Sequence, residues 1–365
     1  MSLREYLPRT TEGDDPYLPC PQTGPSEQDV STVNAVNIAI QDYLKALNSW
    51  PPYSTVSSPN SQIFTNKDHK TATKFKLLPE YWQSLSYTEA LLWLEKLSEK
   101  TKQAKAACDQ IHEQILRSQQ RETANIQQII SLSHSGLMQV IKWIPGESLT
   151  CATRNTQKLD NILKDPQPIT SLLNLLVEMQ TLGYIHTDLK PDNIIVEKAN
   201  NITLIDTDMV TKSSDTPTTE GLLGTPGFIP PYAAGLNGVT YYNSHPSRDY
   251  YALAMTIGHM LASKFGKNNW DKFLDNGQAV SHNGIECANK ISNWHKIRAF
   301  TRSKSTNTES ILRKIRELDS NMDLKNGIYR LWEIMMHILR EGENVKMTHG
   351  LIDQFAIATP NLSEI

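Results

Sequence analysis

The sequence predicts an α+β fold in which a small β-rich part precedes a larger helical part. Between Tyr53 and Leu78, short β-prone runs alternate with turn-forming segments, and strands are expected at 53–56, 62–65 and 71–78. After Pro145 the apolar residues return mostly at helical spacing. A chain of 365 residues is longer than a domain with a single hydrophobic core usually is, so two lobes or two domains are expected.

The remaining elements follow in chain order. Residues 1–30 are rich in polar residues and proline, which is typical of a tail, and apolar spacing predicts a helix over 33–47. A long helix is expected over 87–119, followed by strands over 126–133 and 137–144. An apolar stripe predicts a helix that ends at Gly183. A hairpin with strands over 193–196 and 202–206 follows, and helices are expected beyond residue 247.

Charge and cysteine usage exclude several classes of protein. The net charge is only −3, so the molecule as a whole has no long-range electrostatic field that would attract nucleic acid or a membrane. The four cysteines are far apart and form no C-x-x-C pair, which argues against a zinc site and a disulfide framework. No apolar segment resembles a secretory signal or a transmembrane helix, so a cytoplasmic protein is expected.

One segment carries the chemistry. Residues 185–193 read I-H-T-D-L-K-P-D-N, and Asp206 follows at the end of a predicted strand. Phosphoryl transfer requires oxygen ligands for a divalent metal and a base for the acceptor hydroxyl. Asp188 and Asn193 bracket a loop and Asp206 closes the hairpin, so these three side chains are expected to converge.

This segment resembles the catalytic loop of eukaryotic-type protein kinases, H-R-D-x-x-x-x-N. The resemblance implies a two-lobed protein-kinase-like fold with a β-rich N-lobe and a helical C-lobe, which uses ATP and Mg²⁺ or Mn²⁺. It implies that Asp188 is the catalytic base and that Lys190 neutralises the γ-phosphate. Asn193 and Asp206 would hold the metal.

Two later segments resemble the same family in the same order. Gly224–Pro231 is similar to the end of a kinase activation segment. Asp249–Ala254 is similar to the start of the buried helix that supports the catalytic loop.

The resemblance also implies where nucleotide binds. Residues 140–147 resemble the hinge between the lobes, with Ile141 as gatekeeper. Backbone groups of Lys142 and Ile144 would pair with adenine. Glu147 lies where a ribose-binding acid often lies, and the alternative is a surface glutamate after a Pro-Gly turn.

The lysine that binds the α- and β-phosphates is expected on the third strand. Lys74 fits the A-x-K pattern and is preferred, whereas Lys76 has the better apolar flank; both point to one face. This lysine is expected to pair with a glutamate of the following helix. The number of residues before the hinge selects Glu113, whereas the number of residues after the lysine selects Glu95. Either glutamate could instead be solvated.

Several family features are altered. The turn over 57–61 contains no glycine, although glycine normally allows close backbone approach to phosphate. Thr187 replaces the arginine of the motif, so activation by loop phosphorylation is not expected. D-T-D at 206–208 replaces D-F-G, and Asp208 is interpreted as a solvated turn acid, with an additional metal ligand as the alternative. Tyr232 stands where a glutamate would form an anchoring salt bridge.

A basic patch is a second candidate site. Its residues could receive a polyanion such as an inositol phosphate, a phosphoinositide headgroup or nucleic acid, and the alternative is a solvated helical face. The patch comprises Lys290, Lys296, Arg298, Arg302, Lys304, Arg313, Lys314 and Arg316.

The predicted organisation is a tail and helix (1–49), an N-lobe with a helical insertion (50–141), a C-lobe (142–320) and a helical extension (321–365). The predicted function is an ATP-dependent protein kinase, preferably for Ser/Thr, acting on a protein substrate. Two alternatives stay open: a nucleotide-binding pseudokinase and a small-molecule kinase of the aminoglycoside or choline type. The divergence suggests a bacterial effector, which would place it in the host cytosol.

Overall fold

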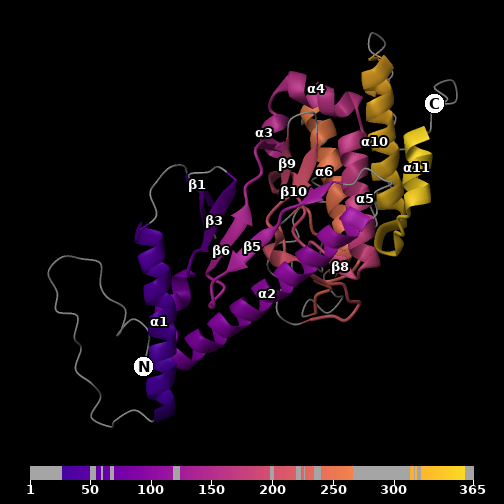
Figure 1. Cartoon of the computed structure of the whole chain (residues 1–365). Coiled ribbons are helices and arrows are strands. Elements are labelled where there is room, and N and C mark those ends of the chain that lie inside the picture. Colours follow the sequence, from indigo (N-terminus) through magenta and orange to yellow (C-terminus); the bar gives the residue numbers. More distant parts are fainter. Residues whose placement is uncertain are drawn as a thin grey trace. The chain divides into compact units, whose positions relative to one another are not determined.

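A computed structural model gives the fold of two compact units, which are described separately (Figure 1). The first unit comprises Met1–Ala106 and Gln128–Trp143, and the second comprises Ala107–Gln127 and Ile144–Ile365. The structure describes residues 27–49, 55–58, 61–65, 70–117, 124–197, 201–218, 223–225, 227–233, 240–265, 313–315, 317–318 and 322–357.

The first unit contains a five-stranded antiparallel sheet in the order β1-β2-β3-β6-β5. The meander predicted between residues 53 and 78 is confirmed as β1–β3, with strand ends shifted by a few residues. The strands are β1 (Thr55–Ser58), β2 (Ser61–Thr65), β3 (Thr71–Lys76), β5 (Ile129–Leu132) and β6 (Met138–Lys142).

The two faces of this sheet bury different apolar clusters. Phe64 and Phe75 pack edge to face with ring centroids 5.5 Å apart, in one cluster with Val36 and Ile40 of α1 (Glu27–Ser49). The predicted helix over 33–47 is therefore present, and it begins earlier. Its buried residues, Val36, Ile40 and Tyr43, recur four and three apart, which places one stripe against the sheet. Ala72, Ile129 and Ile141 form a second, smaller cluster.

Helix α2 (Tyr87–Arg117) follows the short helix η2 (Glu80–Ser84). Ser86 begins α2 with a capping box, in which its backbone N–H donates to Glu89 Oε2 over 2.7 Å and Glu89 N–H donates to Ser86 Oγ over 3.3 Å. Buried positions then recur at helical spacing, including Leu94, Thr101 and Ala104. The long helix predicted over 87–119 is confirmed.

The second unit contains a four-stranded sheet in the order β4-β10-β9-β7. The predicted hairpin is confirmed, because β9 and β10 pair antiparallel. The strands are β4 (Asn125–Ile126), β7 (Glu147–Ser148), β9 (Ile194–Val196) and β10 (Ile202–Leu204), and a separate pair joins β8 (Tyr184–Ile185) to β11 (Thr211–Lys212).

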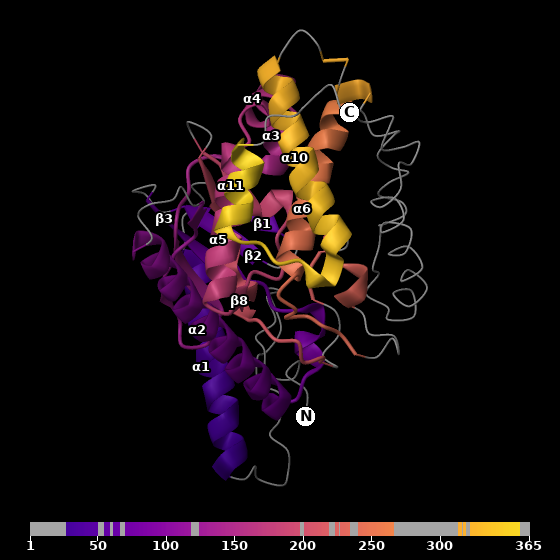
Figure 2. The ribbon, with the colours of Figure 1, turned by 90° about the vertical axis from the view of Figure 1, so that its right-hand side faces the viewer.

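Helices form the main core of the second unit. Helix α5 is buried over most of its length and stops before Gly183, whose φ of 75° is the usual conformation after a helix end. Helix α10 packs on α4 and α6, and α11 packs on α5 (Figure 2). The predicted C-terminal extension thus contributes to this core. The helices are α3 (Leu149–Ala152), α4 (Thr156–Lys164), α5 (Gln167–Thr181), α6 (Arg248–Phe265), α10 (Met322–Glu341) and α11 (His349–Ile357).

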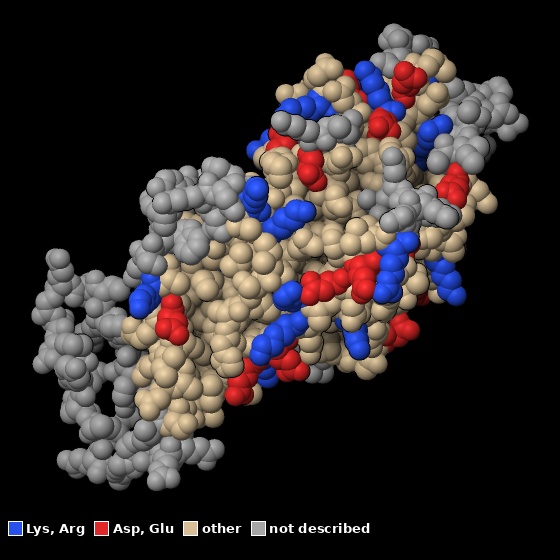
Figure 3. All heavy atoms as spheres, viewed as in Figure 1, with Lys and Arg blue, Asp and Glu red and all other residues tan. Residues whose placement is uncertain are grey.

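Acidic and basic side chains are interspersed on the face shown in Figure 3. This distribution agrees with the nearly balanced composition. Within the described ranges, no helix combines the length and apolar character that crossing a membrane requires.

Candidate active site

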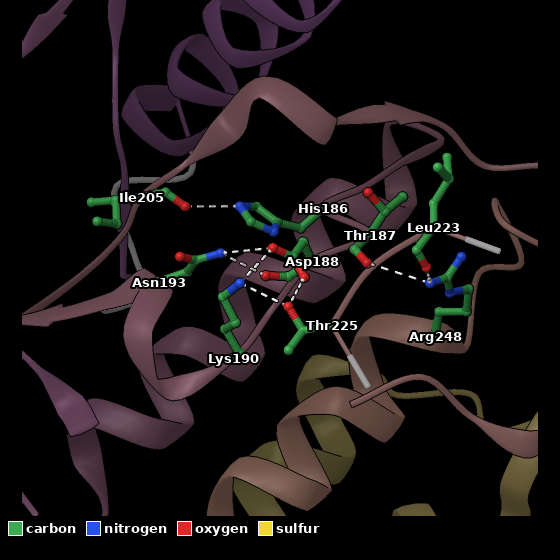
Figure 4. Close-up of polar contacts among 9 residues, drawn as sticks. All are labelled: His186, Thr187, Asp188, Lys190, Asn193, Ile205, Leu223, Thr225 and Arg248. Carbon is green, nitrogen blue, oxygen red and sulfur yellow. Dashed lines mark hydrogen bonds and ion pairs between the residues drawn. The ribbon is translucent and has the colours of Figure 1, made fainter. Parts of the chain in front are cut away.

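The catalytic-loop residues lie between β8 and β9, and their backbone is held by the core of the second unit. His186 is fully buried, and its Nε2 contacts the carbonyl oxygen of Ile205 over 3.0 Å (Figure 4). This contact ties the loop to the residue that precedes Asp206. The loop and the hairpin are therefore joined at this point.

Asp249 of α6 supports the loop from beneath. Its carboxylate accepts hydrogen bonds from the backbone N–H groups of His186 (2.6 Å) and Thr187 (3.0 Å). Burial raises the pKa of Asp249, while the charge of His186 and these backbone hydrogen bonds act in the opposite direction. The prediction that residues 249–254 begin a buried supporting helix is confirmed.

Thr187 adopts a strained backbone conformation. Its φ of 68° is in the left-handed region, which a β-branched residue rarely enters. Two contacts hold it there: the N–H donates to Asp249, and Oγ1 donates to the carbonyl oxygen of Met209 over 2.9 Å. Thr187 therefore links the catalytic loop to η5 (Thr207–Met209), the helix that follows Asp206.

Asp188 is the centre of a ring of short polar contacts (Figure 4). Lys190 Nζ lies 2.9 Å from Asp188 Oδ2 and donates to Thr225 Oγ1 over 2.7 Å. Thr225 Oγ1 in turn donates to Asp188 Oδ1 over 2.6 Å. The ring orients both carboxylate oxygens and sets a cation beside them, with the Asp188 side chain only 14% exposed.

Asn193 and Asp206 lie at the same end of the β9–β10 hairpin. The N–H of Ile205 donates to the Asn193 carbonyl over 2.8 Å, which pairs the two strands up to this point. Asn193 Nδ2 donates to the Asp188 carbonyl over 2.8 Å, so its Oδ1, the ligand atom of an amide, points elsewhere. Asp206, with φ 61°, is also in the left-handed region.

The residues at this hairpin end fit a magnesium or manganese ion. Mg²⁺ is usually held by one or two protein oxygens together with substrate phosphates and water. Asn193 and Asp206 would supply such a pair, and in the described ranges no group of three or more His, Cys, Asp or Glu is placed to hold a metal ion. The interpretation of Asp208 as a solvated acid is wrong, because this side chain is buried within η5.

The candidate phosphate-binding lysines lie on β3. Lys74 is only 6% exposed, whereas Lys76 at the strand end is half-buried. Lys74 pairs with Gln139 of β6, and Ala72 pairs with Ile141, the predicted gatekeeper. Lys74 therefore shares a face with the small apolar cluster that contains Ala72 and Ile141.

Neither candidate glutamate on α2 is buried. Glu113 is 62% exposed and forms an ion pair of 2.6 Å with Arg117, and Glu95 is exposed as well. The other acids of α2 are also exposed. The structure therefore favours the solvated alternative for both. Near the lysine, the fully buried side chain of Gln139 has no hydrogen-bond partner for its oxygen or nitrogen among the described residues.

The hinge residues lie at the division between the units, which falls between Trp143 and Ile144. The N–H of Lys142 donates to the Gln128 carbonyl over 2.9 Å. Glu147, in β7, forms a salt bridge with Lys158 of α4.

Most of the basic patch lies outside the described residues, namely Lys290, Lys296, Arg298, Arg302, Lys304 and Arg316. Arg313 lies 3.9 Å from Glu317, and Lys314 Nζ donates to the Phe265 carbonyl over 3.2 Å. In the turn over 57–61, Pro59 and Asn60 also lie outside the described residues.

Sequence reasoning missed two residues of the site. Thr225 belongs to the segment that resembles an activation segment, yet no role was assigned to it. Arg248 precedes the supporting aspartate and gave no signal at all. Tyr232, which stands where the family has a glutamate, places its hydroxyl 2.5 Å from Ser247 Oγ.

Comparison with known proteins agrees with this geometry. The protein kinase domain model matches residues 92–323, which is more than half of the chain. Serine/threonine-protein kinase F of Synechocystis sp. is 29% identical over 109 residues, covering 29% of this chain and 21% of that relative. The chain thus spans about a fifth of the relative's length. With the loop, hairpin and supporting helix in the expected order, the chain belongs to the protein kinase domain family and has its α+β, two-lobed fold.

Proposed function

We propose that this protein is an ATP-dependent protein kinase that transfers the γ-phosphoryl group to a Ser or Thr hydroxyl of a protein. The observation that carries the proposal is the ring of Asp188, Lys190 and Thr225. The Ser/Thr preference draws on the spacing of Lys190 from Asp188 and on the name of the Synechocystis relative.

Asp188 has the capacity to act as the base. A carboxylate can accept about four hydrogen bonds. Lys190, Thr225 and, more weakly, Asn193 Nδ2 at 3.3 Å occupy three of these positions. One position remains for the hydroxyl of the acceptor. Lys190 would neutralise negative charge on the transferred phosphoryl group.

Asn193 and Asp206 would hold Mg²⁺ or Mn²⁺. When bound, such an ion offsets the charge of the nucleotide phosphates. The anchored Nδ2 of Asn193 supports this role, because the anchoring presents Oδ1 as the ligand atom.

The nucleotide would be bound by residues from the hinge and from β3. We assign phosphate binding to Lys74 rather than Lys76, because Lys74 is buried beside the apolar cluster that contains the gatekeeper. Backbone groups of Lys142 and Ile144 would pair with adenine. Glu147 would contact the ribose only if its salt bridge with Lys158 opened.

A test requires variants of the loop and the hairpin. Asp188→Asn should lower kcat by about 10²–10⁴-fold, and Asp206→Asn should abolish metal-dependent transfer. Asp192→Asn is the matched control, because Asp192 is exposed in the same loop. Transfer of label from ATP to a generic protein acceptor is measured with Mg²⁺ or Mn²⁺. Equal rates in all four proteins would refute the proposal.

The same proteins separate the two alternatives when ATP binding is also measured and an aminoglycoside or choline is also offered as acceptor. A pseudokinase would bind ATP without transferring label in any of the proteins. A small-molecule kinase would phosphorylate an aminoglycoside or choline but no protein. Cytoplasmic action, in a host cell if the protein is a bacterial effector, is part of the proposal, and nucleic acid is not an expected partner.

Activation by a polyanion is a further part of the proposal. The basic patch would bind an inositol phosphate or a phosphoinositide headgroup, and Arg313 is its exposed member in the described residues. Transfer rates with and without inositol hexakisphosphate test this part, and an identical rate would remove it.

A further inference from the structure

We infer that Arg248 locks the catalytic loop to the activation segment in its working position without any phosphate group. The inference rests on the proposed kinase function. In the family pattern, the arginine replaced here by Thr187 receives an activation-loop phosphate. This chain instead supplies a buried arginine from α6, and that arginine binds backbone carbonyl groups.

Arg248 contacts three segments, and Figure 4 shows two of them, at Leu223 and Thr187. Its Nη2 donates to the Leu223 carbonyl over 2.5 Å and makes a longer contact of 3.5 Å to the Thr187 carbonyl. Its Nη1 donates to the Asn243 carbonyl over 2.5 Å. Asn243 Oδ1 also accepts from the N–H of Leu223 over 2.9 Å, so Leu223 is held through both its backbone groups.

The burial of this guanidinium strengthens its hydrogen bonds, because little water is present to compete for them. Arg248 is only 2% exposed, and burying a cation is costly unless carbonyl oxygens or an acid replace its water. The carbonyls of Asn243 and Leu223 do so for Nη1 and Nη2, whereas Nε has no partner among the described residues. The negative charge of the adjacent Asp249 also stabilises the cation. Because the fork of arginine reaches several acceptors at once, lysine cannot reproduce these contacts.

Gly224 supplies independent evidence for the close approach. Its φ is 108°, and a Cβ there would lie 2.9 Å from the Thr187 carbonyl oxygen and 3.0 Å from Arg248 Nη2. Thr225, whose hydroxyl orients Asp188, is the next residue. The position of Thr225 therefore depends on a segment that Arg248 fixes. A link made of backbone carbonyls is always present, unlike one that needs a phosphate.

The experiment compares Arg248→Lys and Arg248→Met with Arg330→Lys, a control at another arginine whose Nε is buried. Hydrogen exchange of peptides that contain Thr187 and Leu223 should be about tenfold faster in both Arg248 variants, because charged hydrogen bonds are lost. On a peptide acceptor, kcat/KM should fall about 10–100-fold while the KM for ATP stays nearly constant. Phosphatase treatment should leave the wild-type rate unchanged.

Unchanged exchange in Arg248→Met, or a large loss of wild-type activity after phosphatase treatment, would overturn the inference. If Arg248→Met does not fold, Gly224→Ala carries the test, because it displaces the same segment and leaves the arginine in place. If the wild type transfers no phosphoryl group, the proposed function fails, and the exchange readout still tests the lock.

Discussion

Thr225 Oγ1 donates a 2.6 Å hydrogen bond to Asp188 Oδ1 and accepts one of 2.7 Å from Lys190 Nζ. One hydroxyl thus joins the proposed base and its cation, although Thr225 is more than 30 residues away in the chain. Because the hydroxyl satisfies both charged groups, the orientation of the Asp188 carboxylate depends on it.

Replacing this hydroxyl should impair transfer more than folding. Thr225→Val keeps the shape and removes hydrogen bonds to charged groups, each worth about 1.5–3 kcal/mol. We expect kcat to fall about 10–100-fold. Thr225→Ser retains the hydroxyl and should stay within about threefold of wild type. Steady-state rates on one peptide acceptor decide this, and a Thr225→Val enzyme at the wild-type rate would contradict it.

The hydrogen bond from Thr187 to Met209 should be measurable in stability. Thr187→Val keeps the branched shape and the strained φ but removes the donor, leaving the Met209 carbonyl without this partner. We expect a loss of about 0.5–1.5 kcal/mol in the free energy of unfolding. Thr187→Ser keeps the donor and serves as the control. Urea titrations measure both, and equal losses would show that the hydroxyl contributes nothing.

Gln139 should be replaceable without loss of stability. A buried amide without partners costs about 1–3 kcal/mol, so Gln139→Met should be neutral or stabilising. The control is Gln127→Met, since Gln127 Oε1 accepts from the N–H of Asp206 over 3.4 Å and its loss should destabilise. The change in melting temperature of each variant, measured by thermal unfolding, shows whether it is stabilised or destabilised. A destabilised Gln139→Met would mean that the amide is satisfied in solution.

His245 should make stability depend on pH. Burial lowers the pKa of His245 below its ordinary value of 6.5, with Asp215 acting in the opposite direction. The unfolded chain then binds the proton more readily than the folded protein. The free energy of unfolding is therefore at its full value above pH 6.5, and it falls as the pH drops from there through the lowered pKa. Protonation of Nδ1 also prevents it from accepting the N–H of Ser247.

The measurement is the urea midpoint between pH 7.5 and 5. His245→Gln should show a smaller loss on acidification than wild type. His337→Gln is the necessary comparison, because burial lowers the pKa of His337 too. An acid dependence that is the same in His245→Gln and in wild type would contradict the prediction.

The elements that are marked by turn residues or by regular apolar spacing were predictable from the sequence. The β9–β10 hairpin and Asp249 lie where the residue patterns indicated, because turn residues and apolar spacing act over short distances. Counting along the chain could not decide between Glu113 and Glu95, since the exposure of each glutamate depends on how α2 packs. Arg248 was missed for a related reason: its acceptors are backbone carbonyls, which carry no residue-type signal.

Helix α1 has a practical consequence for truncation of the chain. Its Tyr43 hydroxyl donates to the Lys76 carbonyl over 2.9 Å, and its apolar stripe covers Phe75. Removal of residues 1–49 would leave the neighbours of Lys74 facing water, and a fragment cut to the matched residues 92–323 would lack β1–β3 altogether. A fragment intended for activity measurements should therefore begin before residue 92 and include α1 and β1–β3.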